Sequence, residues 1–370
     1  WGISHPTRTN QFNFSTISFK YYKDAFARLE AFKADEFDFI HENVSKNWAR
    51  SYLGKAFKSG ERLKKEFPNS NPAGMQGYIF NIRNPIFKDK NVRKAITLAM
   101  DFEWMNRQLF YNQYIRSYSY FTNSQMAASG TASDLEVALL NKISKKINKN
   151  FDPEILGSVP IPPDNSGNGA LRINLREAKK LLETAGWKIK NGELVNKEGQ
   201  KFKFEILLDS RGWERVVAPF SRNLRKLGIT AKTRVTDISL YKKRIDNFEF
   251  DMLVHWYLSS QNPGNELYFR FGSLSSDQKG SDNFIGLKDP FVDEIIEKIL
   301  LSKKRSDLIV SSKLLDRVLL FGYYAIPHWH NKVHRVAYDK DLMRPQNFPL
   351  YYAAEDWAMS TWWWNGDNTK

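Results

Sequence analysis

Strand and helix patterns alternate along residues 202–256, and no other feature of the sequence constrains the fold as strongly. Short apolar runs predict strands at 202–208, 230–235 and 252–256, and apolar residues at helical spacing predict helices at 214–226 and 239–246. Gly228 ends the first of these helices, where a left-handed backbone is favourable for glycine. This order is typical of α/β layers. We therefore expect an α/β fold with mainly parallel strand pairing.

The flanking segments add further elements. Strands are predicted at 18–22, 37–40, 78–82 and 324–329, and helices at 24–33, 91–110, 135–147, 290–301 and 306–321. Asn174 is predicted to cap one more helix, which Gly186 closes. The first strand, helix and strand predict a small βαβ unit. Breaker residues at 69–77 indicate a crossing between domains, and those at 153–169 indicate a loop.

The composition removes several classes of function. The 370 residues include no Cys, which excludes disulfides, thiolate nucleophiles and Cys-based metal sites. The sequence has no phosphate loop, dinucleotide fingerprint or G-x-S-x-G elbow. The net charge of +15 is spread over all segments, which favours solvated helix faces over a nucleic-acid surface. No apolar run has the length of a membrane span, residues 1–30 lack a signal peptide, and the start at Trp1 predicts a processed or cut N-terminus.

Aromatic and small polar residues gather where two predicted strands end. Trp256 and Tyr257 precede a polar loop, and Trp329 lies between His328 and His330. Flat rings with a polar edge bind sugars, peptides and bases, and ligands of open α/β sheets settle at the carboxyl ends of strands. The loop adds the candidate ligand residues Ser259, Ser260, Asn262 and Asn265. A metal on the two imidazoles would need further ligands, which the spacing does not supply, so we predict neither a metal nor a cofactor.

Three stretches in this order resemble the bacterial extracytoplasmic solute-binding protein family 5, the dipeptide and oligopeptide binders. They are residues 84–101 (NPIFKDKNVRKAITLAMD), 185–187 (AGW) and 251–265 (DMLVHWYLSSQNPGN). Further stretches are similar to the oligopeptide and microcin C-binding subgroup of ABC importers: 75–81 (MQGYIFN), 101–106 (DFEWMN), 123–130 (NSQMAASG), 260–266 (SQNPGNE) and 319–330 (LLFGYYAIPHWH). Members of the family are longer on the N-terminal side, so the chain is expected to be N-terminally truncated.

The resemblance implies a two-lobed, periplasmic-binding-protein-like fold (type II, cluster C). Residues 1–72 would be the remainder of lobe one, 73–328 the ligand-binding lobe two, and 329–370 the return to lobe one. The implied hinge residues are Asn71, Pro72, Gly74 and Pro327. Lobe two would add Met75 and Gln76 to the ligand contacts, and lobe one would add Asn47 and Trp48 from a loop. Many peptide-binding members carry an Asp soon after the loop Trp, which pairs with a free amino group. This loop is neutral there, so that pairing is not expected.

The resemblance implies a binding protein without catalysis, the substrate-binding component of an ABC importer. It would capture extended oligopeptides or peptide conjugates by hinge closure and deliver them to an inner-membrane permease and ATPase complex. A periplasmic monomer that binds no nucleic acid is expected. Three alternatives stay open. An oligosaccharide clamp of the same family suits the aromatic loop equally, a basic nucleic-acid-binding protein would lose affinity steeply with salt, and a hydrolase built on His328 and His330 would lose turnover with a chelator.

Overall fold

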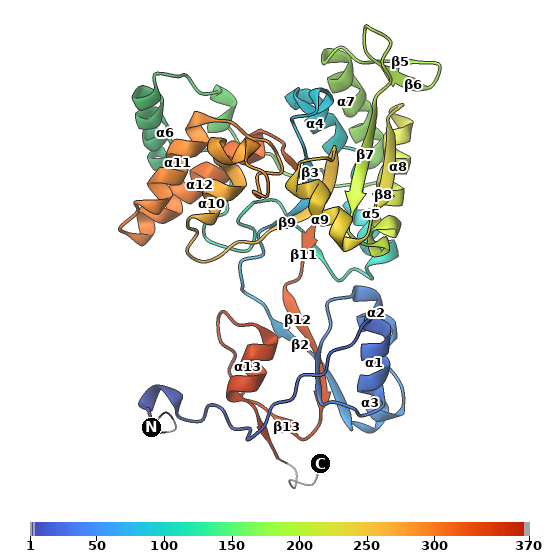
Figure 1. Ribbon diagram of the computed structural model, residues 1–370, viewed down its shortest axis with the longest axis vertical. Helices are drawn as coiled ribbons and strands as arrows, with labels where there is room; N and C mark the ends of the chain where they lie inside the picture. The colour runs from blue at the N-terminus through green and yellow to red at the C-terminus, as the bar shows by residue number, and fades with distance from the viewer. Residues whose placement is uncertain (1, 3, 366–370) are drawn as a thin grey trace. The chain divides into compact units, whose positions relative to one another are not determined.

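The predicted alternation of strands and helices forms part of a five-stranded sheet in the computed structural model, which describes residues 2 and 4–365 (Figure 1). The sheet has the order β10 (Ala325–Pro327), β3 (Met75–Phe80), β9 (Met252–Tyr257), β7 (Lys203–Leu208), β8 (Thr230–Val235). β7 is parallel to β8 and β9, whereas β3 is antiparallel to β9 and β10. The parallel pairing expected from the alternation at residues 202–256 is confirmed for β7, β8 and β9, and β3 and β10 add antiparallel pairs to the sheet. Parallel neighbours are usually linked by one helical crossover, and β3 and β10 are not linked to their sheet neighbours in this way.

The chain divides into two compact units. Unit 2 comprises residues 72–108 and 115–330 and contains the five-stranded sheet, and unit 1 comprises the segment up to Asn71, Leu109–Tyr114 and the segment from Asn331 onward. The chain therefore passes between the units four times. Two of these passages lie within two residues of the boundaries implied by the family resemblance. The excursion of residues 109–114 into unit 1 has no signal in the sequence.

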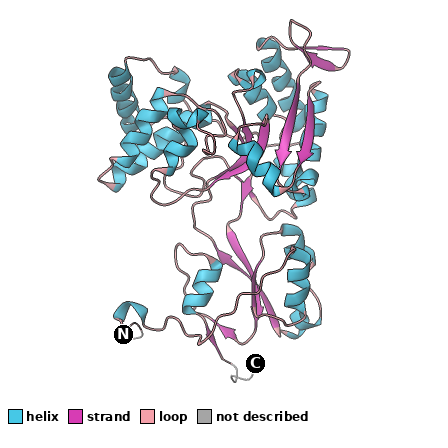
Figure 2. Cartoon of the chain, viewed as in Figure 1, coloured by secondary structure: helices cyan, strands magenta, loops and turns pink. Residues whose placement is uncertain are grey.

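Helices pack on both faces of the unit 2 sheet (Figure 2). The helices of unit 2 are α4 (Lys90–Thr97), α5 (Phe102–Leu109), α6 (Asp134–Ile147), α7 (Ala170–Thr184), α8 (Glu214–Lys226), α9 (Ile238–Asp246), α10 (Glu266–Phe271), α11 (Pro290–Leu300) and α12 (Arg305–Phe321). The short strands of this unit are β4 (Ile115–Arg116), β5 (Lys188–Lys190), β6 (Glu193–Val195) and β11 (Trp329–His330). α6, α11 and α12 share a hydrophobic core with Met75, Ile79 and Leu253. On the other face Phe220 of α8 stacks on Tyr78, with 4.8 Å between ring centroids.

Most predicted helices are confirmed to within two residues, with two exceptions. The single helix predicted at 91–110 is two helices, because the Asp101 side chain accepts a hydrogen bond from a backbone amide of the first turn of α5 and starts a new helix there. Asn174 does not cap α7, which begins before it. Gly186 follows α7 with φ of +85°, the left-handed conformation expected of a closing glycine.

Unit 1 is built on a three-stranded antiparallel sheet in the order β1 (Phe39–His41), β12 (Val333–Asp339), β2 (Arg62–Pro68). Its remaining elements include α1 (Ala25–Lys33), α2 (Ser45–Arg50), α3 (Lys55–Ser59), β13 (Leu342–Met343), α13 (Ala354–Thr361) and β14 (Trp363–Trp364). The predicted βαβ unit is wrong, because residues 18–22 have no hydrogen-bonded neighbour strand and Tyr21 is 92% exposed. Trp357 and Trp362 of the C-terminal region lie in the unit 1 core.

α12 carries two charged side chains into the core of unit 2. Asp316 accepts hydrogen bonds from one hydroxyl and two backbone amides of the segment 119–128, at 2.7 to 2.8 Å. Burial raises the pKa of Asp316 to about 7. Arg317 Nε lies 3.1 Å from Glu136 Oε1, and Arg317 Nη1 donates to the Gly157 carbonyl at 2.8 Å. These contacts fix α6 and the loops around it to α12.

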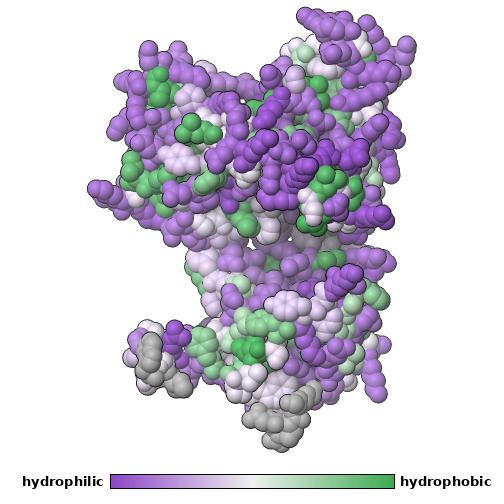
Figure 3. Space-filling model, viewed as in Figure 1, coloured by the Kyte–Doolittle hydropathy of each residue, from purple (hydrophilic) through white to green (hydrophobic). Residues whose placement is uncertain are grey.

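Charged and polar residues lie mainly on the outside. Hydrophilic side chains cover most of the visible face of both units in Figure 3, in line with the solvated helix faces expected from the spread of charge. Among residues 2 and 4–365, no helix combines the length and the apolar character that crossing a membrane needs.

Candidate ligand-binding site

Several candidate residues meet at one edge of the unit 2 sheet. β7, β9 and β10 end at this edge and β3 begins there, because β3 is antiparallel to β9 and β10. Gln76 lies directly opposite Trp256 in the β3–β9 pair, and the His328 amide donates to the Gln76 carbonyl at 2.8 Å. The carboxyl edge of such a sheet is the usual ligand site, so the sequence argument and the topology indicate the same place.

Trp256 is an aromatic residue that this edge presents to solvent. Its side chain is 49% exposed, and its Nε1 donates a hydrogen bond of 2.6 Å to the Ala73 carbonyl. That bond restrains the indole ring, so little conformational freedom would be lost when a ligand stacks on it. Gln76, on the same face of the sheet, is half-buried.

Three predicted ligand contacts on the neighbouring strands are corrected by the structure. Met75 and Tyr257 lie directly opposite each other, and both side chains are buried in the core shared with α11 and α12. Successive side chains of a strand point to opposite faces, so exposure of Trp256 goes with burial of Tyr257. His328 is also fully buried. Met75 and Tyr257 support the site from below, and none of the three side chains is exposed.

The loop after β9 is held mainly by its own polar contacts. The Ser260 hydroxyl accepts a hydrogen bond from the Asn262 amide, Asn262 accepts from Arg305, and Asn265 precedes α10. The Ser259 hydroxyl is buried and meets no hydrogen-bond partner among the described residues. A cavity of about 10 Å³, room for about one water molecule, adjoins this loop.

The charges around the loop are largely cationic. Arg270 donates to the Leu258 carbonyl at 2.6 Å, and Arg305 contacts the Gln261 carbonyl from the other side. Glu266, the acidic residue of the loop region, accepts from the Gly264 amide at 3.0 Å. A loop with this charge is a poor partner for a free amino group, in agreement with the absence of the family's Asp after Trp256.

The His-Trp-His segment forms an aromatic stack, not a pair of free imidazoles. The His328 ring stacks on Trp329 with 4.7 Å between centroids, and Trp213 lies 5.7 Å from His328 and 6.3 Å from Trp329. Burial lowers the pKa of His328 well below its usual value, so the ring is neutral at pH 7. His330 Nδ1 lies 3.2 Å from the Ser117 hydroxyl. Trp329 is 8% exposed, so its predicted stacking with a ligand is limited to an edge.

Sequence reasoning missed three residues beside this stack. Trp213 follows the end of β7, and the strand-end rule that identified Trp256 would have found it if applied to β7. Phe102 and Arg116 flank Trp329: the Phe102 and Trp329 rings are stacked at 6.2 Å, and Arg116 pairs with Trp329 in the β4–β11 ladder. Neither has a local sequence signal.

In unit 1, Asn47 and Trp48 lie in helix α2, not in a loop. Trp48 is 4% exposed, and its Nε1 donates to Glu66 at 2.7 Å. Asn47 donates to Glu42 at 3.2 Å. Because the Trp48 ring packs in a hydrophobic cluster, its side chain is not available for the predicted ligand contact. Asn47 is half-buried.

Two of the four implied hinge residues lie at a passage between the units. Asn71 and Pro72 flank it, and the Asn71 side chain exchanges two hydrogen bonds with the Tyr352 backbone. Gly74 and Pro327 are buried within unit 2, and Pro327 is paired in the sheet. A backbone held in a sheet cannot absorb a large change in φ and ψ, so the hinge assignment is not retained for these two residues.

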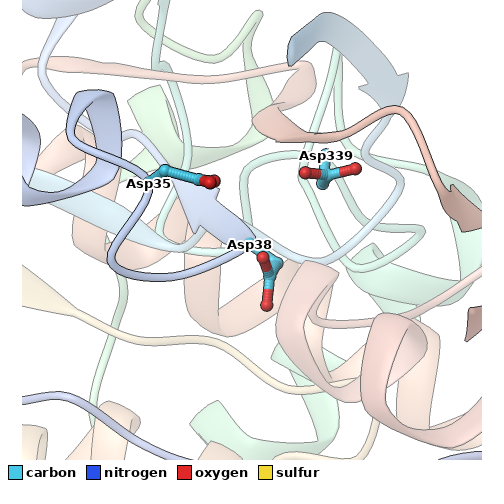
Figure 4. A group of neighbouring side chains, drawn as sticks. All are labelled: Asp35, Asp38 and Asp339. Atoms are coloured by element: carbon cyan, nitrogen blue, oxygen red, sulfur yellow. The ribbon is translucent and has the colours of Figure 1, made fainter. Parts of the chain in front are cut away.

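A group of carboxylates in unit 1 has metal-like spacing. Asp35, Asp38 and Asp339 come from the end of α1, the approach to β1 and the end of β12 (Figure 4). Arg62 makes an ion pair with Asp35 and lies 3.5 Å from Asp339, so a cation of the protein already compensates part of this charge. Within residues 2 and 4–365 no comparable group includes His328 or His330.

Comparison with known proteins identifies the family. The model of the bacterial extracellular solute-binding proteins, family 5 (middle region), matches residues 7–279. The chain belongs to this family. The α/β fold implied by the family resemblance is confirmed by solved structures of family 5 proteins, which match with TM-scores of 0.66 and 0.61.

Curated relatives of this family 5 chain include proteins named for peptide and peptidoglycan binding. It is 35% identical over 369 residues to the probable peptide-binding protein YejA of Agrobacterium fabrum, covering 99% of this chain and 59% of the relative. It is 32% identical over 371 residues to the peptidoglycan-binding protein YepA of the same organism, covering 98% and 59%. The chain thus spans about three fifths of the length of these relatives.

Among solved structures, the oligopeptide-binding protein AppA of Bacillus subtilis, in complex with a nonapeptide, has a TM-score of 0.66 at 20% identity, covering 92% of this family 5 chain and 58% of AppA. DppA of Helicobacter pylori, in complex with the peptide STSA, has a TM-score of 0.62 at 13% identity, covering 93% and 57%. At these identities the structures establish the fold.

Proposed function

We propose that this family 5 chain forms most of the ligand-binding part of an ABC importer's substrate-binding component, which captures extended oligopeptides or peptide conjugates. The observation that carries the proposal is Trp256, a half-exposed ring restrained by its bond to Ala73 at the carboxyl edge of the sheet. The names of the YejA relative and of AppA support a peptide as the ligand. Ser260, Asn262 and Gln76 would hydrogen-bond its backbone.

Capture would proceed by a population shift between open and closed arrangements. A ligand stabilises closure only through contacts that it makes in the closed state and lacks in the open state. Asn71 and Pro72, at one passage between the units, are the hinge residues retained in this proposal. Delivery to an inner-membrane permease and ATPase, a periplasmic location, a monomeric state, the absence of catalysis and uptake of microcin C-type conjugates belong to the same proposal.

A second candidate ligand is a peptidoglycan fragment. The YepA relative is named for peptidoglycan binding, and such fragments combine sugar rings, which stack on indoles, with short peptides. Native mass spectrometry of gently purified protein, followed by denaturation and sequencing of the released mass, separates the two. A released peptide supports the peptide clamp, and a released muropeptide supports the second candidate. A ligand-free mass together with salt-sensitive oligonucleotide binding would overturn both.

Replacing Trp256 by Ala is expected to lower the affinity for the co-purified ligand about tenfold or more, because aromatic anchors typically contribute more than ~1.4 kcal/mol to binding. Trp256→Phe keeps a ring but removes the Nε1–Ala73 bond, so an intermediate loss is expected. Isothermal titration calorimetry on protein freed of ligand by denaturation and refolding measures both.

Trp363→Ala is the matched control, because Trp363 is a partly exposed indole of unit 1 with no predicted role in binding. Equal affinity of wild type and Trp256→Ala would rule out Trp256 as the anchor.

A further inference from the structure

Arg116 carries a buried guanidinium group that has no hydrogen-bond partner within residues 2 and 4–365. Its Nε, Nη1 and Nη2 are shielded from solvent, and none meets an acceptor among the described residues. The group lies over the Phe102 ring, 5.4 Å from its centroid. A buried charge that lacks a partner is strongly destabilising, so an acceptor from outside the chain is a physically reasonable counterpart.

The nearby carboxylates do not serve as that acceptor. Asp101 caps α5 by accepting from the Trp104 amide, and Glu103 Oε2 accepts from the Asn165 amide at 3.1 Å. Both act on Arg116 through space and favour its charged form, but neither forms a hydrogen bond with its guanidinium among the described residues. Burial lowers the pKa of Arg116 only to about 10, so the guanidinium is charged at pH 7.

His328 extends the same donor-rich region. Its ring nitrogens are buried and have no hydrogen-bond partner among the described residues, and its backbone carbonyl accepts from Ser117, next to Arg116, at 3.0 Å. The neutral imidazole has one N–H to donate. Arg270 and Arg305 add positive charge at the loop after β9, and with Arg116 they oppose the negative charge of Asp101 and Glu103 near Arg116.

We propose that Arg116, with His328 beside it, binds a carboxylate group of the ligand. The inference rests on the proposed peptide-binding function and specifies its ligand chemistry, because a planar guanidinium binds a carboxylate through two parallel hydrogen bonds. The carboxylate is either the C-terminus of a peptide or an acidic side chain.

The strand that carries Arg116 connects this site to the passages between the units. β4 begins directly after the passage at Tyr114, and its partner β11 ends at His330, where another passage follows. Arg116 pairs with Trp329, and Ile115 pairs with His330. A carboxylate bound at Arg116 therefore acts on two of the four segments that link the units, which would couple anion capture to closure.

The test is competition between nonapeptide libraries, read by mass spectrometry of the peptides that the protein retains. One library ends in a free carboxylate and one in a carboxamide, both without Asp and Glu, and a third is amidated and contains Asp and Glu. Wild type is expected to retain one carboxylate-bearing library at least about tenfold over the neutral amide. The first library identifies the C-terminus as the source of the anion, and the third identifies acidic side chains. No preference would overturn the inference.

Arg116→Gln is expected to retain the three libraries nearly equally, and Arg107→Gln, which removes an exposed arginine from α5, is expected to keep the wild-type preference. An Arg116→Gln variant that keeps the preference would also overturn the inference. If wild type retains no peptide at all, the proposed function fails. Titration of ¹⁵N-arginine-labelled protein with acetate then decides the inference alone: a saturable shift of the Arg116 Nε–H signal, missing in Arg116→Lys, supports an anion site, and the lack of such a shift refutes it.

A stability measurement separates ligand binding from a structural role. Because Arg116 meets no hydrogen-bond acceptor among the described residues, Arg116→Met is expected to raise Tm by about 2 °C or more while abolishing the carboxylate preference. If Arg116 instead held the fold through Glu103 or Asp101, Arg116→Met would lower Tm by at least as much, and the inference would be wrong.

Discussion

Replacing Arg317 by Ala is expected to lower the free energy of unfolding by about 3–5 kcal/mol, the usual effect of removing one partner of a buried ion pair. Arg317 is fully buried, and its guanidinium contacts Glu136 at 3.1 Å and the Gly157 carbonyl at 2.8 Å. Without it, the Glu136 carboxylate still accepts hydrogen bonds from the Ser133 amide and hydroxyl, but it loses the cation that the structure places beside it. Urea unfolding followed by circular dichroism measures the loss.

Arg234→Ala is the control for Arg317→Ala. Arg234 also forms an ion pair, with Glu205 at 2.6 Å, but its side chain is 60% exposed, so solvent replaces the lost contact and stability should hardly change. The double variant Arg317→Met with Glu136→Leu removes both charges of the buried ion pair and should recover much of the lost stability. Similar unfolding midpoints for Arg317→Ala and Arg234→Ala would contradict the role assigned to Arg317.

Gly74→Ala is expected to cost about 2–6 kcal/mol of stability and to weaken ligand binding as well. Gly74 has φ of +68°, and a Cβ placed there would lie 2.1 Å from the Tyr257 carbonyl oxygen and 2.9 Å from the Ser259 amide nitrogen. The left-handed backbone and the collision each destabilise by roughly 1–3 kcal/mol. Relief of the collision would displace the end of β9, which carries Trp256.

Gly186→Ala separates the two causes. Gly186 also has a positive φ, of +85°, but its Cβ would meet nothing within 4 Å, so only the backbone strain of about 1 kcal/mol is expected. Thermal unfolding compares the stabilities, and calorimetry with the co-purified ligand compares the affinities. Equal losses in the two variants, or an unchanged affinity in Gly74→Ala, would show that β9 tolerates the added methyl group.

Local signals allowed the central elements to be predicted closely. The bounds of α8 and β8 coincide with the predicted ones, because a helical apolar period or a short apolar run is bounded by breakers there. β2 and β12 were missed. β2 contains three charged residues in its first four positions, and its partner strand follows more than 260 residues later, so its pairing depends on contacts that no local window contains.

The site was predictable as a place but not as a set of side chains. The strand-end rule located Trp256, and strand alternation required that Trp256 and Tyr257 face opposite sides. Which of the two is exposed depends on where α11 and α12 pack, and the sequence does not specify this. Arg116 was not identified because what distinguishes it is its environment: its guanidinium is buried and meets no acceptor among the described residues. Residue type and spacing carry no information about that.

The strand order of unit 1 has a consequence for chain synthesis. β12 is the middle strand of its sheet and contacts both β1 and β2, so among the described residues neither β1 nor β2 has a sheet partner until residues 333–339 emerge. By then all residues of unit 2 have been made. The sheet of unit 1 therefore forms after unit 2 has been synthesised, and until then the edges of β1 and β2 are unpaired. This order differs from the N-to-C order of folding that multidomain chains usually follow. Chaperone contact during synthesis should concentrate on β1 and β2, whose edges invite pairing with other chains in that interval.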